Sequence, residues 1–222
     1  IMIKEYDILG ETFVFEDHDG SIAADHVVKD QLIDNYRLHE IEFNPGDIVV
    51  DLGANIGVFA SCLGRKYPDI TIYSIEAVPQ TYKYLLRNLW RNNITNVVPI
   101  LLAVTGGRQE VTMWTRLNAN TGGSSGVILD VEGGVFYKVP GANLDTVFNM
   151  FRIEKCKLLK IDIEGMEYEV LYNFSMLDRV EHMRAEFHMN SNLHKQGYSW
   201  DHLAAYCSNK TRLWWEWCNM SE

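Results

Sequence analysis

Five short segments rich in apolar residues alternate with segments of helical spacing, and this alternation constrains the fold more than any other feature. The five segments are Ile48–Leu52, Ile70–Ile75, Asn96–Val104, Leu158–Ile163 and His182–Phe187. A strand that is apolar throughout is buried on both faces, as in a parallel sheet with helices on each side. The sequence therefore predicts an α/β fold built on a mostly parallel sheet.

Residues 1–42 precede this alternation and are expected to form an N-terminal extension. Polar and apolar residues alternate around Gly10, which predicts a β-hairpin. Ser21 is a candidate helix cap, and the apolar spacing that follows predicts a helix running to about His39. We interpret this extension as part of one domain over residues 1–222.

Residues 106–139 interrupt the alternation between the third and fourth strands. The pattern predicts two antiparallel strands, Glu110–Trp114 and Val135–Val139, and a loop at the Gly- and Ser-rich segment Thr121–Gly126. We interpret this segment as an insertion in the same domain, because no second core is evident.

The formal net charge of −10 disfavours a nucleic-acid substrate, because an acidic protein repels phosphate groups. The basic residues Lys83, Arg87 and Arg91 share one predicted helix and are interpreted as its solvated face. The four cysteines form no CxxC pair, which is typical of a reduced intracellular protein. No apolar run approaches the ~20 residues that cross a bilayer, and Ile1–Glu16 is unlike a signal peptide. We therefore expect a cytoplasmic protein without a membrane partner.

A turn with two glycines follows the first strand and contains the sharpest motif. The motif reads Asp51-Leu52-Gly53-Ala54-Asn55-Ile56-Gly57. Gly53 and Gly57 allow the backbone to turn sharply and a ligand to approach. The fingerprint GxGxxG of dinucleotide-binding proteins would place a glycine at position 55. Its absence, together with the acidic Asp51, argues against a nicotinamide-dependent oxidoreductase.

Glu76 ends the second strand and is the expected partner of this turn. In this architecture an acid at the end of the second strand accepts hydrogen bonds from both ribose hydroxyls. Two carboxylates, Asp51 and Glu76, suit a positively charged nucleoside without phosphate groups. S-adenosylmethionine is such a molecule.

Two motifs together resemble the FkbM family of class I methyltransferases. The segment from Asp51 to Gly57, preceded by Pro45-Gly46-Asp47, resembles the first motif of that family. The segment Leu159-Lys160-Ile161-Asp162-Ile163-Glu164-Gly165-Met166-Glu167 is similar to the second, and Glu186-Phe187-His188 resembles a further Glu-x-His motif. The resemblance covers residues 43–188.

This resemblance implies a Rossmann-like class I fold with an antiparallel edge at its C-terminal end, where Arg212–Trp217 is the clear strand. It also implies S-adenosylmethionine as cofactor and O-methylation of a hydroxyl on a sugar or other small molecule. The residues that it places at the cofactor are Asp51, Gly53, Ala54, Asn55, Gly57, Glu76, Ala77, Ala103, Val104, Asp162 and Glu164.

The end of the fifth strand offers the candidate catalytic residues. An alcohol must lose a proton during methylation, and an unperturbed histidine titrates near neutral pH, so His188 is a candidate base. Glu186 could orient His188 or bind the substrate, and Asp162 is a rival base. Asp162, Glu186 and His188 could instead bind a divalent cation, and metal dependence is left open. Glu167 is expected to stabilise a helix N-terminus, and Lys160 is given no role.

Two alternatives concern function and assembly. A non-catalytic nucleoside-binding protein would keep the same fold, although the acids at three strand ends argue against it. The partner that we expect is a small hydroxylated acceptor. An exposed last strand would also favour a homodimer.

Overall fold

The computed structural model describes residues 1–116, 125–126 and 134–219. Its centre is a six-stranded sheet in which each neighbouring pair of strands is parallel, with the order β12-β11-β10-β3-β4-β5. The strands are β3 (Ile48–Leu52), β4 (Thr71–Glu76), β5 (Val97–Leu101), β10 (Cys156–Ile161), β11 (Val180–Met189) and β12 (Arg212–Asn219). The predicted parallel α/β sheet is confirmed.

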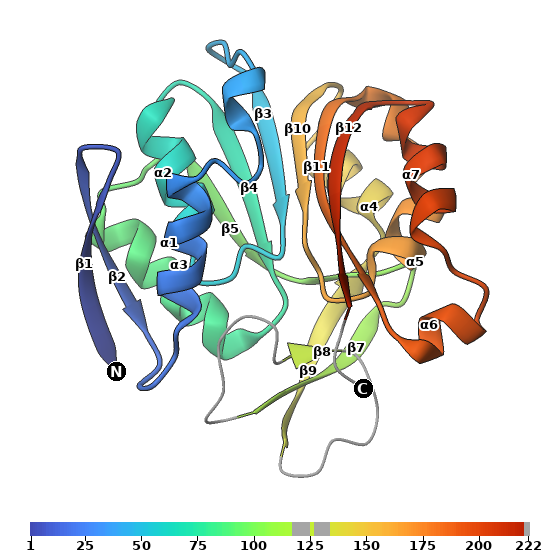
Figure 1. Ribbon diagram of the computed structural model, residues 1–222, viewed down its shortest axis with the longest axis horizontal. Helices are drawn as coiled ribbons and strands as arrows, with labels where there is room; N and C mark the ends of the chain where they lie inside the picture. Colours follow the sequence, from blue (N-terminus) through green and yellow to red (C-terminus); the bar gives the residue numbers. More distant parts are fainter. Residues whose placement is uncertain (117–124, 127–133, 220–222) are drawn as a thin grey trace.

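Helices cover both faces of this sheet, as predicted (Figure 1). One face packs against α2 and α3, and the other packs against α4, α5 and α7. The helices are α2 (Val58–Lys66), α3 (Pro79–Arg91), α4 (Leu144–Met150), α5 (Glu167–Tyr172), α6 (Ser191–Lys195) and α7 (Trp200–Ser208). The strand order reverses between β3 and β10, and open α/β sheets bind ligands at the carboxyl ends of strands at such a point.

The strand β11 departs from the expected apolar pattern because its residues alternate. Met183, Ala185 and Phe187 pack into the core beside α5 and α7. Successive side chains of a strand point to opposite faces, so the residues between them face the other way. Those residues are His182, Arg184, Glu186 and His188. These residues lie on the side of the sheet that packs against α2 and α3. Chain segments rather than a helix cover this part of it, and there the Arg184 Nε donates to the Tyr36 carbonyl oxygen at 2.7 Å.

The C-terminal edge corrects one expectation about the fold. We expected an antiparallel edge, but β12 pairs with β11 in parallel, with Glu186 opposite Glu216 and His188 opposite Cys218. The reason is the crossover between the two strands. The chain leaves the carboxyl end of β11 and returns along α7. It therefore starts β12 at the edge of the sheet where β11 also starts.

The N-terminal extension forms the predicted hairpin, from β1 (Met2–Ile8) and β2 (Glu11–Asp17). The predicted helix is shorter than expected, because α1 covers only Ala23–Leu32 and is followed by the 3-10 helix η1 (Leu38–Glu40). Asp34 and Arg37 both have φ of 50°, a left-handed conformation that no α-helix continues through.

The hairpin is fastened to α3 by amide side chains. The Asn88 side chain accepts the Glu16 N–H and donates to the Glu16 carbonyl, and Asn92 does the same for Val14. Arg87 and Arg91, which we interpreted as part of a solvated face, both bind the Glu16 carboxylate. Their positive charges therefore hold the extension in place.

The segment after β5 forms a second, smaller sheet. The third predicted strand is divided at Leu102, because Ala103–Val104 leaves the main sheet and pairs with β9. The predicted antiparallel pair is confirmed between β7 and β9. Its strands are β6 (Ala103–Val104), β7 (Glu110–Arg116), β8 (Ser125–Gly126) and β9 (Gly134–Ala142). Figure 1 shows this sheet at the end of the molecule where β3 and β11 terminate.

The predicted Gly- and Ser-rich loop lies largely outside the described residues, although its last two residues form β8. Among the helices of the described residues, none combines the length and the apolar character that crossing a membrane would require.

Candidate active site

The turn after β3 is shaped by the approach of β10. Gly53 has a φ of 78°, and a Cβ at this position would lie 1.8 Å from the Asp162 carbonyl oxygen. Gly57 has a φ of 88°, and its Cβ would lie 2.5 Å from the Leu85 side chain. The expected sharp turn is confirmed. At both glycines the atoms that would collide with a Cβ belong to the protein rather than to a ligand.

Glu76 lies beside this turn, as the sequence predicted. Its carboxylate accepts the Asn55 N–H at 2.9 Å and the Val78 N–H at 2.8 Å. Burial is the main cause that raises the pKa of Glu76 to about 7, against the lowering effect of these two amides. Each carboxylate oxygen has a second lone pair with which to accept a further donor.

Ala54 and Asn55 have different positions in the turn. Ala54 is buried in the core cluster beneath α2. Asn55 has a φ of 51°, and its side-chain oxygen accepts the Ile56 N–H at 2.8 Å. The Asn55 backbone therefore faces Glu76 while its side chain stabilises the turn.

The structure brings two of the three predicted small residues together. Ala77 and Ala103 pack in one cluster next to Glu76, and the Leu102 N–H donates to the Glu76 carbonyl at 3.1 Å. Val104 packs into the main core instead, so its side chain points away from that of Ala103.

Asp51 is fully buried and pairs with a residue to which we had given no role. The Lys160 Nζ lies 3.4 Å from Asp51 Oδ1 and 3.7 Å from Asp162 Oδ2, and it donates to the Gly53 carbonyl at 2.9 Å. Burial raises the pKa of Asp51, and Lys160 opposes this effect. Burial alone would lower the pKa of Lys160, but Asp51 and Asp162 raise it. Lys160 of β10 thus links that strand to Asp51 of β3 and to the turn that follows β3.

Acidic side chains surround His188 at the ends of β10 and β11. Its Nε2 lies 3.6 Å from Glu164 Oε2, 3.8 Å from Asp162 Oδ1 and 3.8 Å from Glu186 Oε1. The three predicted catalytic residues are therefore neighbours. Asp162 and Glu186 remain about a quarter exposed, with side-chain exposures of 27% and 26%, so a ligand can reach both carboxylates.

The protonation of His188 differs from the sequence expectation. Burial lowers its pKa, but the hydrogen bond and charge of Glu167, and the charges of Asp162 and Glu164, raise it to about 10. An imidazole with a raised pKa carries its proton at neutral pH, which disfavours His188 as the base, and its catalytic role stays a prediction. The pKa of Glu186 is raised to about 7, mainly by burial and then by Asp162.

Glu167 has a second role that the sequence did not reveal. It is fully buried and accepts the N–H groups of Ile163 and Gly165, as expected near a helix N-terminus. It also binds His188 Nδ1 at 3.0 Å. An acid in the first turn of a helix gave no signal of this contact, whereas Lys160 in a buried strand was an unusual residue that called for an acidic partner.

Comparison with known proteins decides the family. Residues 51–209 match the family described as "Methyltransferase FkbM domain". The chain belongs to the FkbM methyltransferase family. This FkbM-family chain is therefore a methyltransferase, and the matched segment contains Glu76, Asp162, Glu186 and His188.

The individual relatives have low sequence identity to this chain. Methyltransferase sdnD of Sordaria araneosa is 29% identical over 181 residues, which cover 68% of this chain and 69% of that protein. The 31-O-demethyl-FK506 methyltransferase FkbM of Streptomyces tacrolimicus is 24% identical over 181 residues, covering 69% and 70% of the two chains. The crystal structure of Methyltransferase FkbM from Methylobacillus flagellatus KT is 17% identical, with a TM-score of 0.39 over 66% of this chain and 38% of that one.

Proposed function

We propose that this methyltransferase transfers the methyl group of S-adenosylmethionine to a hydroxyl group of a sugar or another small molecule. The observation that supports this most directly is the position of Glu76 against the turn at residues 53–57, a turn that Lys160 connects to the partly exposed carboxylate of Asp162. In this proposal Glu76 binds the ribose and Asp162 holds the reacting group.

The site fits a positively charged nucleoside. Glu76 can accept two ribose hydroxyls with its remaining lone pairs. Lys160 compensates the buried Asp51, whereas the partly exposed carboxylates of Asp162, Glu164 and Glu186 outnumber the positive charge of His188. This acidic surrounding attracts a sulfonium ion and repels a diphosphate. It therefore supports S-adenosylmethionine over a nicotinamide dinucleotide.

The proposed reaction places few demands on the protein. S-adenosylmethionine, when bound, supplies an electrophilic methyl group on a positively charged sulfur. The protein must hold the acceptor oxygen in line with that methyl at about 3 Å. Asp162 accepts the hydroxyl proton as the new O–C bond forms and the S–C bond breaks, with its electron pair left on sulfur. His188 holds positive charge beside Asp162 and Glu186 and positions both carboxylates.

Location and partners are part of the same proposal. The four cysteines are free, which supports a reducing, cytoplasmic location. The acidic net charge argues for a small-molecule acceptor rather than a nucleic acid. The edge strand β12 exposes Trp217, at 59%, which supports a homodimer formed by pairing between two copies.

The test is a screen of hydroxylated small molecules with methyl-labelled S-adenosylmethionine, followed by kinetics of Asp162→Asn on the best acceptor. We expect kcat to fall by about 10²–10⁴-fold, the usual contribution of a positioned base. The affinity for S-adenosylhomocysteine, measured by calorimetry, should change little. Asp178→Asn, an exposed acid on the 3-10 helix η2 (Leu177–Arg179), is the control and should retain full activity.

Two results would contradict the proposal. The cofactor assignment fails if calorimetry detects no binding of S-adenosylmethionine or S-adenosylhomocysteine, or if NAD binds more tightly. The catalytic assignment fails if Asp162→Asn is as active as Asp178→Asn.

A further inference from the structure

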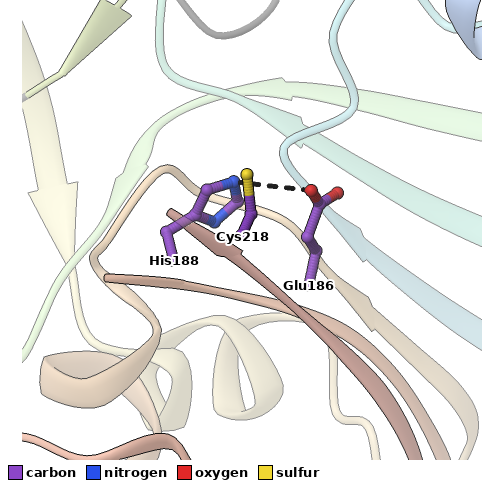
Figure 2. Close-up of side chains that lie close together, drawn as sticks. All are labelled: Glu186, His188 and Cys218. Carbon is purple, nitrogen blue, oxygen red and sulfur yellow. Dashed lines mark ion pairs between the residues drawn. The ribbon is translucent and has the colours of Figure 1, made fainter. Parts of the chain in front are cut away.

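We propose that Glu186, His188 and Cys218 bind a divalent transition-metal ion at the carboxyl ends of β11 and β12. One ligand atom from each residue (a carboxylate oxygen, a ring nitrogen and the thiol sulfur) lies within 4.8 Å of the other two. Figure 2 shows the three side chains directed toward one another. Glu186 and His188 were candidate ligands from the sequence alone, whereas Cys218 had no assigned role.

The backbone fixes this arrangement. Parallel pairing places His188 directly opposite Cys218 on the neighbouring strand. Glu186 precedes His188 by two residues, and residues two apart on a strand face the same side. The three ligands therefore share one face of two hydrogen-bonded strands, and little side-chain freedom has to be lost when an ion binds.

His188 is oriented as a ligand by a residue outside the group. It is 3% exposed, and its Nδ1 contacts the buried carboxylate of Glu167 at 3.0 Å. Glu167 is itself fixed by the N–H groups of Ile163 and Gly165. This leaves Nε2 directed at the group. Metal-binding histidines commonly have such a carboxylate on the other ring nitrogen, where it fixes the tautomer and the ring orientation.

The spacing of the ligand atoms suits a shared ion. His188 Nε2 and Glu186 Oε1 are 3.8 Å apart, which is too long for a hydrogen bond. Ligands that bind one tetrahedral ion at 2.0–2.1 Å are about 3.4 Å from each other. A small inward movement of the two side chains would therefore place both in contact with the same ion.

The charge balance supports a cation at this position. Asp162 and Glu164 also approach Nε2, at 3.8 and 3.6 Å, so four carboxylates including Glu167 surround one imidazole. A dication that displaces the Nε2 proton of His188 and the thiol proton of Cys218 leaves the net charge of the group unchanged, so it would take the place of the imidazolium among these carboxylates. Asp162, Glu164 and His188 also form a group within 4.8 Å, so a carboxylate is available as a fourth ligand.

The ligand types indicate which metal. A thiolate and an imidazole favour zinc and other late first-row ions over magnesium and calcium, which prefer oxygen ligands alone. If the proposed methylation of a hydroxyl is correct, the acceptor oxygen would occupy the fourth coordination position instead of that carboxylate, and the ion would make its proton easier to remove. This role depends on the proposed function, whereas metal binding itself does not.

The test uses Co²⁺ and Zn²⁺ on the whole chain after treatment with a chelator. We expect one Co²⁺ per chain, with a thiolate-to-cobalt charge-transfer band in the near ultraviolet that Zn²⁺ removes by competition. Cys218→Ser should abolish this band. Glu186→Gln and His188→Gln should weaken Co²⁺ binding at least tenfold. Cys62→Ser and Glu181→Gln are matched controls on other parts of the chain and should bind as the unmodified protein does.

The site is contradicted if Co²⁺ binding does not saturate at one equivalent, or if Cys218→Ser keeps the charge-transfer band. It is also contradicted if the controls weaken binding as much as the ligand variants do. Calorimetry with S-adenosylhomocysteine on the same samples separates the two proposals. Intact nucleoside binding without metal binding overturns only the metal site, and metal binding without nucleoside binding overturns only the proposed cofactor.

Discussion

The ammonium group of Lys160 lies between two carboxylates that come from different strands. It contacts Asp51 of β3 and Asp162 after β10, and it donates to the Gly53 carbonyl between them. Its side chain is 5% exposed and that of Asp51 is fully buried. Removal of one member of a buried ion pair leaves the other charge without compensation, which costs far more than the loss of a surface pair.

We predict that Lys160→Met lowers the free energy of unfolding by about 3–5 kcal/mol, because Asp51 would stay buried without its cation. Urea denaturation followed by tryptophan fluorescence measures this change. The control is Lys138→Met, which removes the exposed pair with Glu110 and should cost less than about 1 kcal/mol. Equal losses in the two variants would show that the Lys160 contacts do not stabilise the fold.

Glu76 predicts the pH dependence of nucleoside binding. Burial raises its pKa to about 7 in the free protein, and ribose hydroxyls donate to the ionised carboxylate. Below pH 7 a proton must leave before the nucleoside binds, so affinity for S-adenosylhomocysteine should fall as pH falls, approaching tenfold per pH unit. Above pH 7 this contribution should be constant. Calorimetry over a range from about pH 5.5 to about pH 8.5 measures this dependence.

The matched variant is Glu76→Gln, which keeps the shape of the side chain and cannot ionise. Its affinity should be weaker and should lose this dependence on pH. If the unmodified protein and Glu76→Gln change in parallel, another group is responsible for the titration.

At the scale of single residues, the sequence was informative where a residue type is unusual for its position. Glu76 lies beside the turn as predicted, whereas Asp51 is fully buried and pairs with Lys160 rather than facing a ligand. The contacts of Glu167 with His188 were not predicted, because they join residues 21 positions apart through a turn whose path the sequence does not specify. The high pKa of His188 follows from those contacts and could not be inferred without them.

Among the structural elements, the turn from β3 to α2 depends on the distance between two strands. Gly53 must combine a left-handed φ with the absence of a side chain, because the carbonyl group of Asp162 occupies the place of a Cβ. Gly46 has a similar φ of 85°, but nothing lies within 4 Å of its Cβ position. Replacement of Gly46 would therefore cause backbone strain alone, whereas replacement of Gly53 would cause both strain and a steric collision.

We predict that Gly46→Ala costs about 1–2 kcal/mol, the strain of a left-handed alanine. Gly53→Ala should cost at least about 4 kcal/mol, because a carbonyl oxygen must move as well. It should also weaken binding of S-adenosylhomocysteine, since the β3 turn and Asp162 would separate. Thermal unfolding and calorimetry measure the two effects. Similar stability of the two variants would mean that the strands separate at little cost.

Elements buried on both faces were predicted best. The bounds of β3 agree with the predicted Ile48–Leu52, because a short apolar run between turn residues has few alternatives. The third strand was predicted as one segment, since its apolar pattern continues through Leu102 while the backbone leaves the main sheet there. In β11 the alternation was present in the sequence, but we interpreted the strand only as apolar.

At the scale of the whole molecule, the alternation of strands and helices predicted the parallel sheet and its two helical layers. It did not predict the direction of β12, because we relied on the family resemblance rather than on the crossover through α7. It also did not predict how the N-terminal extension docks, since that depends on contacts between Glu16 and α3 far along the chain.

The docking of the hairpin on α3 has a consequence for self-association. A strand at the rim of a sheet can recruit a strand from another molecule through its open peptide groups. Along β2, the Asn88 and Asn92 amides already occupy those groups at Val14 and Glu16, so the helix mimics one more strand. The two asparagines thus block this edge, and their replacement would leave the N–H and C=O groups of Val14 and Glu16 free to pair with a strand of another molecule.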